Sequence, residues 1–170
     1  FHIKRLLEVG LLEKNSEGDY SLTIIGKEFA NRMDTDTIQI ERQAKIGINI
    51  GCVRANDNGE TEYLIQQRLK NPYFGYFGFV GGKIRWGETI FEAAARELNE
   101  ETGLSGDFKL VGIKHKMDYG DNNEMLEDKF FFVVTAFNLA GNLKEEFDSG
   151  KNQWMTKEEF LNVENKFDGV

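Results

Sequence analysis

Three glutamates near the middle of the chain, Glu97, Glu100 and Glu101, are spaced so that they could hold a metal ion. On a helix, residues three and four apart lie on one face, so the three carboxylates would be neighbours. Like charges at this spacing repel each other by about 0.2–0.5 kcal/mol per pair on an open surface. Bound Mg2+ or Mn2+ would remove this repulsion, because hard oxygen ligands suit both ions. The alternative is a solvated acidic face that Arg96 balances.

The stretch before these glutamates favours the metal site over the solvated face. Gly81 and Gly82 follow the hydrophobic run YFGFV and lead toward the helix. Thr89 and Glu92 form a capping box, which predicts a helix start at Thr89, and Gly103 suits a left-handed end to that helix. A glycine-bearing loop that feeds a helix N-terminus lets the backbone approach a phosphate group or a metal ion.

The whole stretch, GKIRWGETIFEAAARELNEETGL, resembles the Nudix box, G-x5-E-x7-R-E-U-x-E-E-x-G-U, in which U is a bulky aliphatic residue. Every specified position matches. The residues that fill these positions are Gly82, Glu88, Arg96, Glu97, Leu98, Glu100, Glu101, Gly103 and Leu104. Family-like strand patterns extend the resemblance from about residue 38 to the C-terminus.

The resemblance implies a hydrolase that acts on acid anhydrides in phosphorus-containing compounds, with a nucleotide-type small molecule as substrate. Such an enzyme uses Mg2+, or Mn2+, to cleave the pyrophosphate linkage of a nucleoside diphosphate joined to another moiety. Carboxylate-bound metal suits this reaction, because it neutralises a pyrophosphate and lowers the pKa of bound water. The implied metal ligands are the Gly81 carbonyl and the side chains of Glu97, Glu100 and Glu101.

The resemblance also implies roles for the other polar residues of the box. Glu88 and Arg96 would brace the loop against the helix and orient the carboxylates. The general base stays open between Glu97 and Glu101.

Outside the box, three residues are candidates for substrate binding. Arg68 and Lys83 stand where related enzymes often contact phosphate, and the alternative for each is an ordinary surface charge. Asp148 stands where the family often has an additional acidic ligand or base. Its rivals for that role are Glu127, Glu145 and Glu146.

The substrate subclass is open. The family often has proline before the double glycine, and this chain has Val80. Pro72 is the single proline, so no downstream proline marks an ADP-ribose hydrolase. Tyr119 lies near a tyrosine position of dinucleoside-polyphosphate hydrolases, and an oxidised-nucleotide hydrolase is equally open. The aromatic residues within 73–77 could stack on a base or belong to the core.

The order of predicted elements indicates the α/β class and an α/β/α sandwich with a mixed sheet, which is also the Nudix fold. Asn58-Gly59 predicts a hairpin turn. Thr156 with Glu159 predicts a C-terminal helix. A polar loop is predicted at 118–128. Strands are predicted at 45–53, 62–69, 76–80, 109–117, 130–137 and 153–155.

Residues 1–36 are predicted to be a small α+β unit that precedes a Nudix domain at 37–170. A helix ending at Gly10, strands at 11–14 and 20–25, and a helix at 27–33 resemble the second half of a winged-helix domain. A nucleotide-sensing transcriptional regulator is therefore the alternative function. The unit has five basic and seven acidic residues, whereas a DNA-reading surface is usually basic. Packing or homodimer formation is favoured over DNA binding.

Composition sets further expectations. The net charge of −8 argues against a broad nucleic-acid surface. Cys52, the single cysteine, cannot form an internal disulfide and is expected to be a buried, inert thiol in a cytoplasmic protein. No apolar run approaches the length of about 18 residues that a membrane span needs.

Overall fold

The computed structural model describes residues 2–34 and 39–167. The chain divides into two compact units, Phe1–Gln43 and Ala44–Val170. The predicted boundary, between residues 36 and 37, lies outside the described residues.

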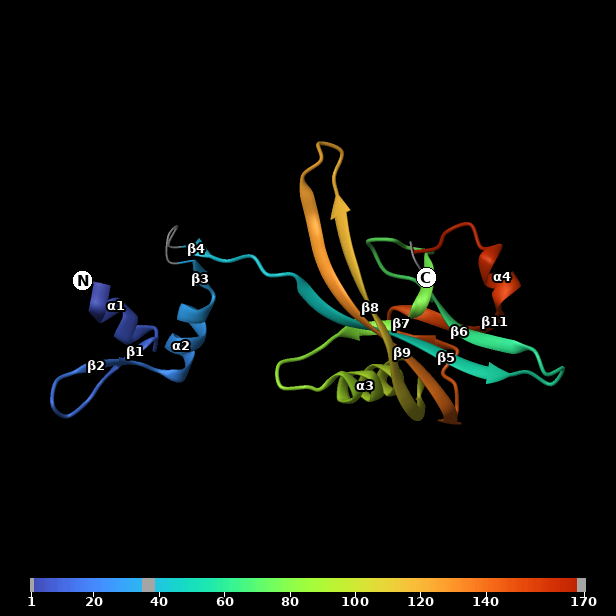
Figure 1. Cartoon of the computed structure of the whole chain (residues 1–170), viewed down its shortest axis with the longest axis horizontal. Coiled ribbons are helices and arrows are strands. Elements are labelled where there is room, and N and C mark those ends of the chain that lie inside the picture. Colours follow the sequence, from blue (N-terminus) through green and yellow to red (C-terminus); the bar gives the residue numbers. More distant parts are fainter. Residues whose placement is uncertain (1, 35–38, 168–170) are drawn as a thin grey trace. The chain divides into compact units, whose positions relative to one another are not determined.

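The first unit is a small α+β structure, as expected (Figure 1). Strands β1 and β2 form an antiparallel hairpin, and the two-residue strands β3 and β4 also pair. The elements are α1 (His2–Glu8), β1 (Leu12–Lys14), β2 (Tyr20–Leu22), α2 (Ile24–Asn31), β3 (Met33–Asp34) and β4 (Gln39–Ile40). The resemblance of this unit to a winged helix stays a prediction.

Helix α2 begins earlier than the sequence pattern indicated. Ile24 and Ile25, predicted as the end of a strand, form its first turn, because the Thr23 hydroxyl accepts a hydrogen bond from the Gly26 amide at 3.0 Å. A Cβ atom at Gly26 would overlap the carbonyl of Leu11. Glycine is therefore required inside the helix, where it lets α2 pack closely against the start of the hairpin.

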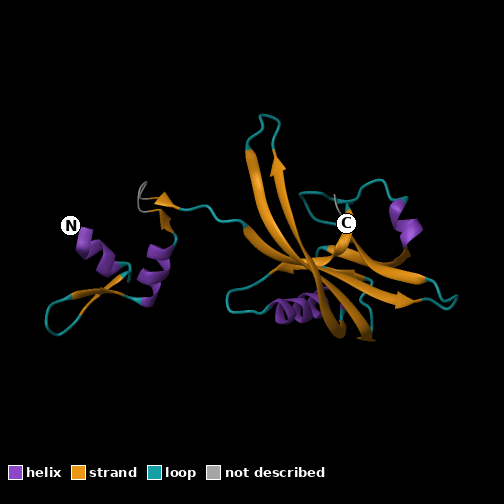
Figure 2. Cartoon of the chain, in the orientation of Figure 1, coloured by secondary structure: helices purple, strands orange, loops and turns teal. Residues whose placement is uncertain are grey.

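The second unit is built on a mixed sheet of seven strands in the order β10-β11-β6-β7-β5-β9-β8 (Figure 2). Strands β5 and β9 are parallel, and the other neighbours are antiparallel. The strands are β5 (Lys45–Ala55), β6 (Thr61–Arg68), β7 (Phe77–Lys83), β8 (Leu104–Tyr119), β9 (Met125–Gly141), β10 (Glu146–Phe147) and β11 (Gly150–Thr156).

Helices α3 (Ile90–Thr102) and α4 (Lys157–Leu161) cover opposite faces of this sheet. Val80 of β7 belongs to the same buried cluster as Leu98 of α3. The neighbouring Phe79 instead contacts Phe160 of α4, with 6.2 Å between the ring centres. Because successive strand residues point to opposite faces, the two helices sandwich the sheet, and the predicted α/β/α architecture is confirmed.

The sequence correctly predicted the ends of α3. Thr89 and Glu92 form both bonds of the capping box, and Gly103 ends the helix with a φ angle of +72°. Ala94 and Leu98 on its apolar stripe are fully buried. The helix is thus held in place at both ends and along one face.

The β8–β9 hairpin is longer than predicted and extends beyond the other strands (Figure 1). The predicted loop at 118–128 is wrong, because Asp118 pairs with Glu127 and only residues 120–124 lie outside the two strands. Backbone hydrogen bonds continue the ladder through charged residues, which a search for apolar alternation overlooks.

Cys52 is buried, and burial raises the pKa of its thiol to about 12, as expected of an inert cysteine. No helix in the described part of the chain is long and apolar enough to cross a membrane.

Candidate active site

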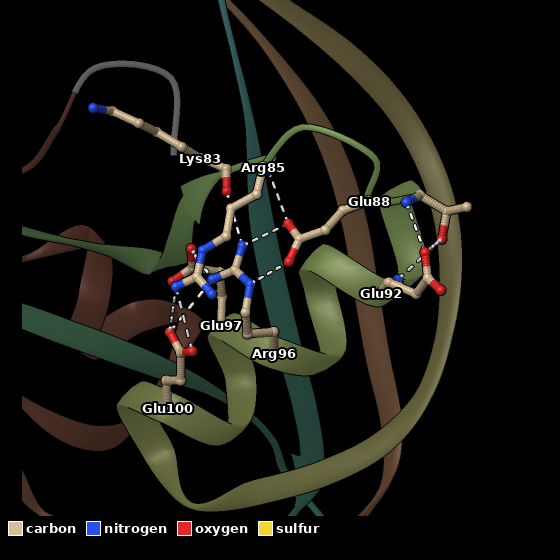
Figure 3. Close-up of polar contacts among 8 residues, drawn as sticks. Lys83, Arg85, Glu88, Glu92, Arg96, Glu97 and Glu100 are labelled. Carbon is tan, nitrogen blue, oxygen red and sulfur yellow. Dashed lines mark hydrogen bonds and ion pairs between the residues drawn. The ribbon is translucent and has the colours of Figure 1, made fainter.

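Arg96 of α3 ties the loop that precedes the helix to the helix itself (Figure 3). Its Nε and Nη2 atoms donate to the two carboxylate oxygens of Glu88 at 2.5 and 2.8 Å. Nη1 donates to Glu97 at 2.6 Å, and Nη2 also donates to the Lys83 carbonyl at 3.0 Å. The hydrogen bonds from Arg96 lower the pKa of Glu88 to about 2. The two residues predicted as a brace are therefore bonded to each other, as a permanently charged pair.

Arg85 is a second arginine beside these glutamates, and the sequence analysis did not single it out. Its backbone amide donates to Glu88 at 2.8 Å, and its Nη2 lies 3.4 Å from both carboxylate oxygens of Glu100. Arg96 Nη1 also lies 3.4 Å from Glu100. The only feature of the sequence that could have indicated Arg85 is its position, as a basic residue in the loop between Gly82 and Glu88.

The two glycines at the end of β7 permit a close approach to their neighbours. A Cβ atom at Gly82 would overlap the carboxylate of Glu97, and one at Gly81 would overlap the carbonyl of Ile48. The carboxylate thus lies directly against the backbone of β7.

Glu101, in the last turn of α3, has a different environment from the other glutamates. Its Oε2 atom is buried and has no hydrogen-bond partner. Burial raises the pKa of Glu101 to about 7, which a hydrogen bond from Gln66 and the charge of Arg68 only partly oppose. The charges of Glu97 and Glu100 raise this pKa further.

Gln66 and Asn152, which sequence reasoning missed, support this corner of the site. They are opposite each other on β6 and β11, and Gln66 Nε2 donates to Asn152 Oδ1 at 3.1 Å. Asn152 Nδ2 in turn donates to the backbone carbonyl of Glu101 at 2.9 Å. Amides in two strands carry no pattern that marks them as site residues.

A cleft of about 740 Å³ opens beside Glu101. Of the residues predicted to bind metal or substrate, it is lined by Gly81, Glu101, Arg68 and Lys83. Asp148 is exposed and does not line it, although its neighbours Phe147 and Ser149 do. Of the three rivals to Asp148, Glu127 lines the cleft, and Glu145 and Glu146 do not.

The side chains predicted to bind metal do not converge on one point. Within residues 2–34 and 39–167, no group of three or more His, Cys, Asp or Glu side chains is placed to hold an ion. Glu97 and Glu100 instead bond to arginines. The donor set nevertheless fits a hard divalent cation, because Glu101 has a buried oxygen without a partner, and such a group is costly unless an opposite charge reaches it.

The family model described as the NUDIX domain matches residues 45–169. The chain belongs to the Nudix hydrolase family. This assignment rests on most of the second unit rather than on the box alone.

Individual Nudix proteins support the assignment. The ADP-ribose pyrophosphatase of Methanocaldococcus jannaschii is 27% identical over 128 residues, which are 74% of this chain and 72% of that protein. Nudix hydrolase 2 of Arabidopsis thaliana is 27% identical over 154 residues, 87% of this chain and 50% of that protein.

Solved Nudix structures share the fold. The NUDIX domain of Shewanella oneidensis NrtR, complexed with ADP ribose, has a TM-score of 0.64 and 16% identity, and the match covers 84% of this chain and 90% of that domain. A MutT protein from Bacillus halodurans has a TM-score of 0.58 and 26% identity, covering 69% of this chain and 71% of that one.

Proposed function

We propose that this Nudix protein is a Mg2+-dependent hydrolase that cleaves the pyrophosphate linkage of a nucleoside diphosphate joined to another moiety. The observation that supports this most strongly is Glu101, a half-buried residue that lines the cleft and whose Oε2 atom is buried without a partner. A buried carboxylate oxygen without a partner has little structural value, but it suits a site where a cation and a pyrophosphate meet.

The proposed ligands are Glu97, Glu100, Glu101 and the Gly81 carbonyl. A divalent ion bound there would neutralise the pyrophosphate and lower the pKa of a water molecule. Arg96 holds the carboxylate of Glu97 at 2.6 Å and shares Glu100 with Arg85. An ion that bound these two carboxylates would replace their contacts with the arginines, while the bond from Arg96 to Glu88 holds the loop.

The proposed nucleotide base would lie at the aromatic end of the cleft. Tyr73 and Phe167 line it, with their ring centres 5.5 Å apart, and Phe147 lines it nearby. Aromatic rings stack on any base without reading its hydrogen-bonding edge, so the cleft suits a nucleotide. ADP-ribose belongs among the compounds to be tested, since one relative is named as its pyrophosphatase and one structural neighbour is complexed with it.

The test is turnover of a nucleotide panel by the whole chain with Mg2+. The panel holds nucleoside di- and triphosphates, ADP-ribose, NADH and dinucleoside polyphosphates, and Glu101→Gln is assayed beside the wild type. We expect hydrolysis of at least one compound and its loss in the variant. No turnover, together with a nucleotide that still raises the melting temperature, would show a binding site without catalysis.

A nucleotide-sensing transcriptional regulator is the second candidate, favoured by the separate α+β unit at the N-terminus. If the protein were such a regulator, it would bind duplex DNA with an affinity that falls steeply with salt. Gel-shift titrations at low salt test this. We expect no binding, because acidic residues outnumber basic ones in residues 1–36.

A further inference from the structure

Three lysines lie in a row across neighbouring strands, on the face of the sheet opposite α3. Lys45 of β5 is paired with Lys129 of β9, which is paired with Lys116 of β8. Directly paired residues point to the same face, and strands are about 4.8 Å apart, so the row spans about 10 Å. All three lysines line the cleft.

A second row of the same face adds two more lysines. Lys83 of β7 is paired with Gly47 of β5, which is paired with Phe131 of β9, and Phe131 is paired with Lys114 of β8. Both lysines line the cleft. The two rows place five lysines around one ring, that of Phe131, and we call these five residues the lysine cluster.

Two described carboxylates form ion pairs with three lysines of the cluster. Glu127 forms ion pairs with Lys45, at 3.0 Å, and with Lys129. Asp118 lies 3.1 Å from Lys116. Among the described residues of the cleft, Lys45, Lys83, Lys116 and Lys129 therefore lie near these two carboxylates, in a chain whose net charge is −8.

The three lysines of the first row share two carboxylates, so an additional anion would stabilise the row. Like charges directly opposite each other in a sheet are destabilising. Desolvation lowers the pKa of Lys129; the charge of Asp118 opposes this shift, and the charges of Lys45, Lys116 and Lys83 add to it. A purely structural role would be served better by alternating charges on the three strands.

The lysine cluster and the aromatic side chains line the same cleft as Glu101. Tyr73 and Phe147 suit a base, and Glu101 lies beside the proposed site of cleavage. The lysines form a third, positively charged part of the cleft, and neither a base nor a neutral sugar would need that charge.

Building on the proposed function, we propose that the lysine cluster selects substrates in which the moiety beyond the pyrophosphate carries its own anionic group. That group is a phosphate or a carboxylate, held mainly by Lys45, Lys116 and Lys129. Nucleoside diphosphates joined to a neutral sugar are correspondingly poorer substrates.

Two substrate pairs, assayed with the whole chain and Mg2+, test this preference. ATP and ADP-ribose share adenosine diphosphate and differ in having a phosphate or a neutral ribose beyond it. UDP-glucuronate and UDP-glucose differ in one carboxylate. We expect kcat/KM to favour at least one anionic member by about 10-fold or more, the size of one charge-assisted hydrogen bond. The pair that shows the preference identifies the anion as phosphate or carboxylate.

Binding is measured separately from turnover. Calorimetry with the α,β-methylene analogues of ATP and ADP-ribose, which cannot be cleaved at that bond, gives the same comparison as a ratio of Kd values. The double variant Lys116→Gln/Lys129→Gln should reduce the preference to within about twofold. The control Lys109→Gln/Lys151→Gln removes equal charge outside the cleft and should preserve it. If the double variant fails to fold, Lys116→Gln alone serves.

The outcomes separate this inference from the proposed function. Turnover with equal kcat/KM within both substrate pairs, and equal Kd values for the two analogues, would overturn the anion preference and leave the proposed hydrolase function intact. Preferential binding of the ATP analogue without any turnover of the substrates would support anion selection by the lysine cluster and would contradict the proposed hydrolase function. No binding of any compound, or equal losses in the double variant and its control, would overturn the inference.

Discussion

Two glutamates of the Nudix box, Glu88 and Glu101, have opposite electrostatic environments. Hydrogen bonds from Arg96 lower the pKa of Glu88 to about 2, whereas burial raises that of Glu101 to about 7. Glu88 is therefore a fixed anion that holds Arg96 in place. Glu101 has one buried oxygen without a partner, and this difference suggests a structural role for the first residue and a ligand role for the second.

Glu101→Gln should stabilise the metal-free protein at pH 8. The unfolded state releases the Glu101 proton near its ordinary pKa of 4.5, whereas the folded state keeps the proton up to about pH 7. The free energy of unfolding of the wild type therefore falls as pH rises through this window, by up to about 3 kcal/mol. Glutamine removes that penalty. Urea denaturation in EDTA at pH 5 and pH 8 measures the difference.

The same variant should lose the stabilisation that Mg2+ gives. In the wild type at pH 8, we expect the melting temperature to rise as Mg2+ is added, because the ion binds only the folded state. In Glu101→Gln the rise should be absent or much smaller. Equal rises in both proteins would show that Glu101 is no ligand.

At the scale of elements, the site depends on how β7 meets α3. The backbone at Gly82 lies against the carboxylate of Glu97, where a Cβ atom would overlap it. The loop between these elements is fastened by the bonds from Arg96 to Glu88 and to the Lys83 carbonyl. The position of Glu97 is therefore set by a strand, a loop and a helix together.

Gly82→Ala should lower kcat by about 10²-fold, because displacing a catalytic group by about 1 Å has effects of that size. The displaced group is the end of a flexible side chain, so the fold should survive. Gly112→Ala is the matched control, since a Cβ atom there meets nothing within 4 Å. Steady-state kinetics with the substrate from the panel measure both variants. A Gly82→Ala enzyme as active as Gly112→Ala would show that this close approach is unimportant.

Elements whose signals are local could be predicted from the sequence. The capping boxes at Thr89 and Thr156 and the left-handed end at Gly103 correctly marked two helices, since caps depend on residues a few positions apart. The β8–β9 ladder was missed because its ends are charged. The early start of α2 was missed because the need for Gly26 comes from Leu11, which is distant in sequence.

Much of the site depends on register, which no single stretch of sequence reveals. Glutamates at 97, 100 and 101 share one spacing pattern, yet only Glu101 has a buried oxygen without a partner. Lys45, Lys116 and Lys129 come from three strands far apart in the chain. Their alignment follows from the parallel pairing of β5 with β9, which becomes visible only in the folded sheet.

At the scale of the whole molecule, the proposed chemistry belongs to the second unit alone. Every described residue that lines the cleft lies within Lys45–Phe167, and the family match covers 45–169. The cleft is rich in lysine although the chain has a net charge of −8. This distribution concentrates the positive charge where an anionic substrate would bind.

A protein of residues 44–170 should therefore retain Mg2+-dependent turnover, with kcat within about threefold of the longer chain, because the described residues of the cleft all belong to it. Kinetics on both proteins, with circular dichroism to check folding, measure this. A folded but inactive 44–170 protein would show that the first unit contributes to the reaction.

The most direct test of the central claim is hydrolysis in H2(18O) of the compound that the panel selects, followed by mass spectrometry of the products. A Mg2+-dependent pyrophosphohydrolase should yield two phosphorylated products, with one 18O atom incorporated into one of them per turnover. Glu101→Gln should yield neither product above background. If the wild type binds the nucleotide but releases no labelled product at any Mg2+ concentration, the chain is not a hydrolase of that nucleotide, and the site works by binding alone.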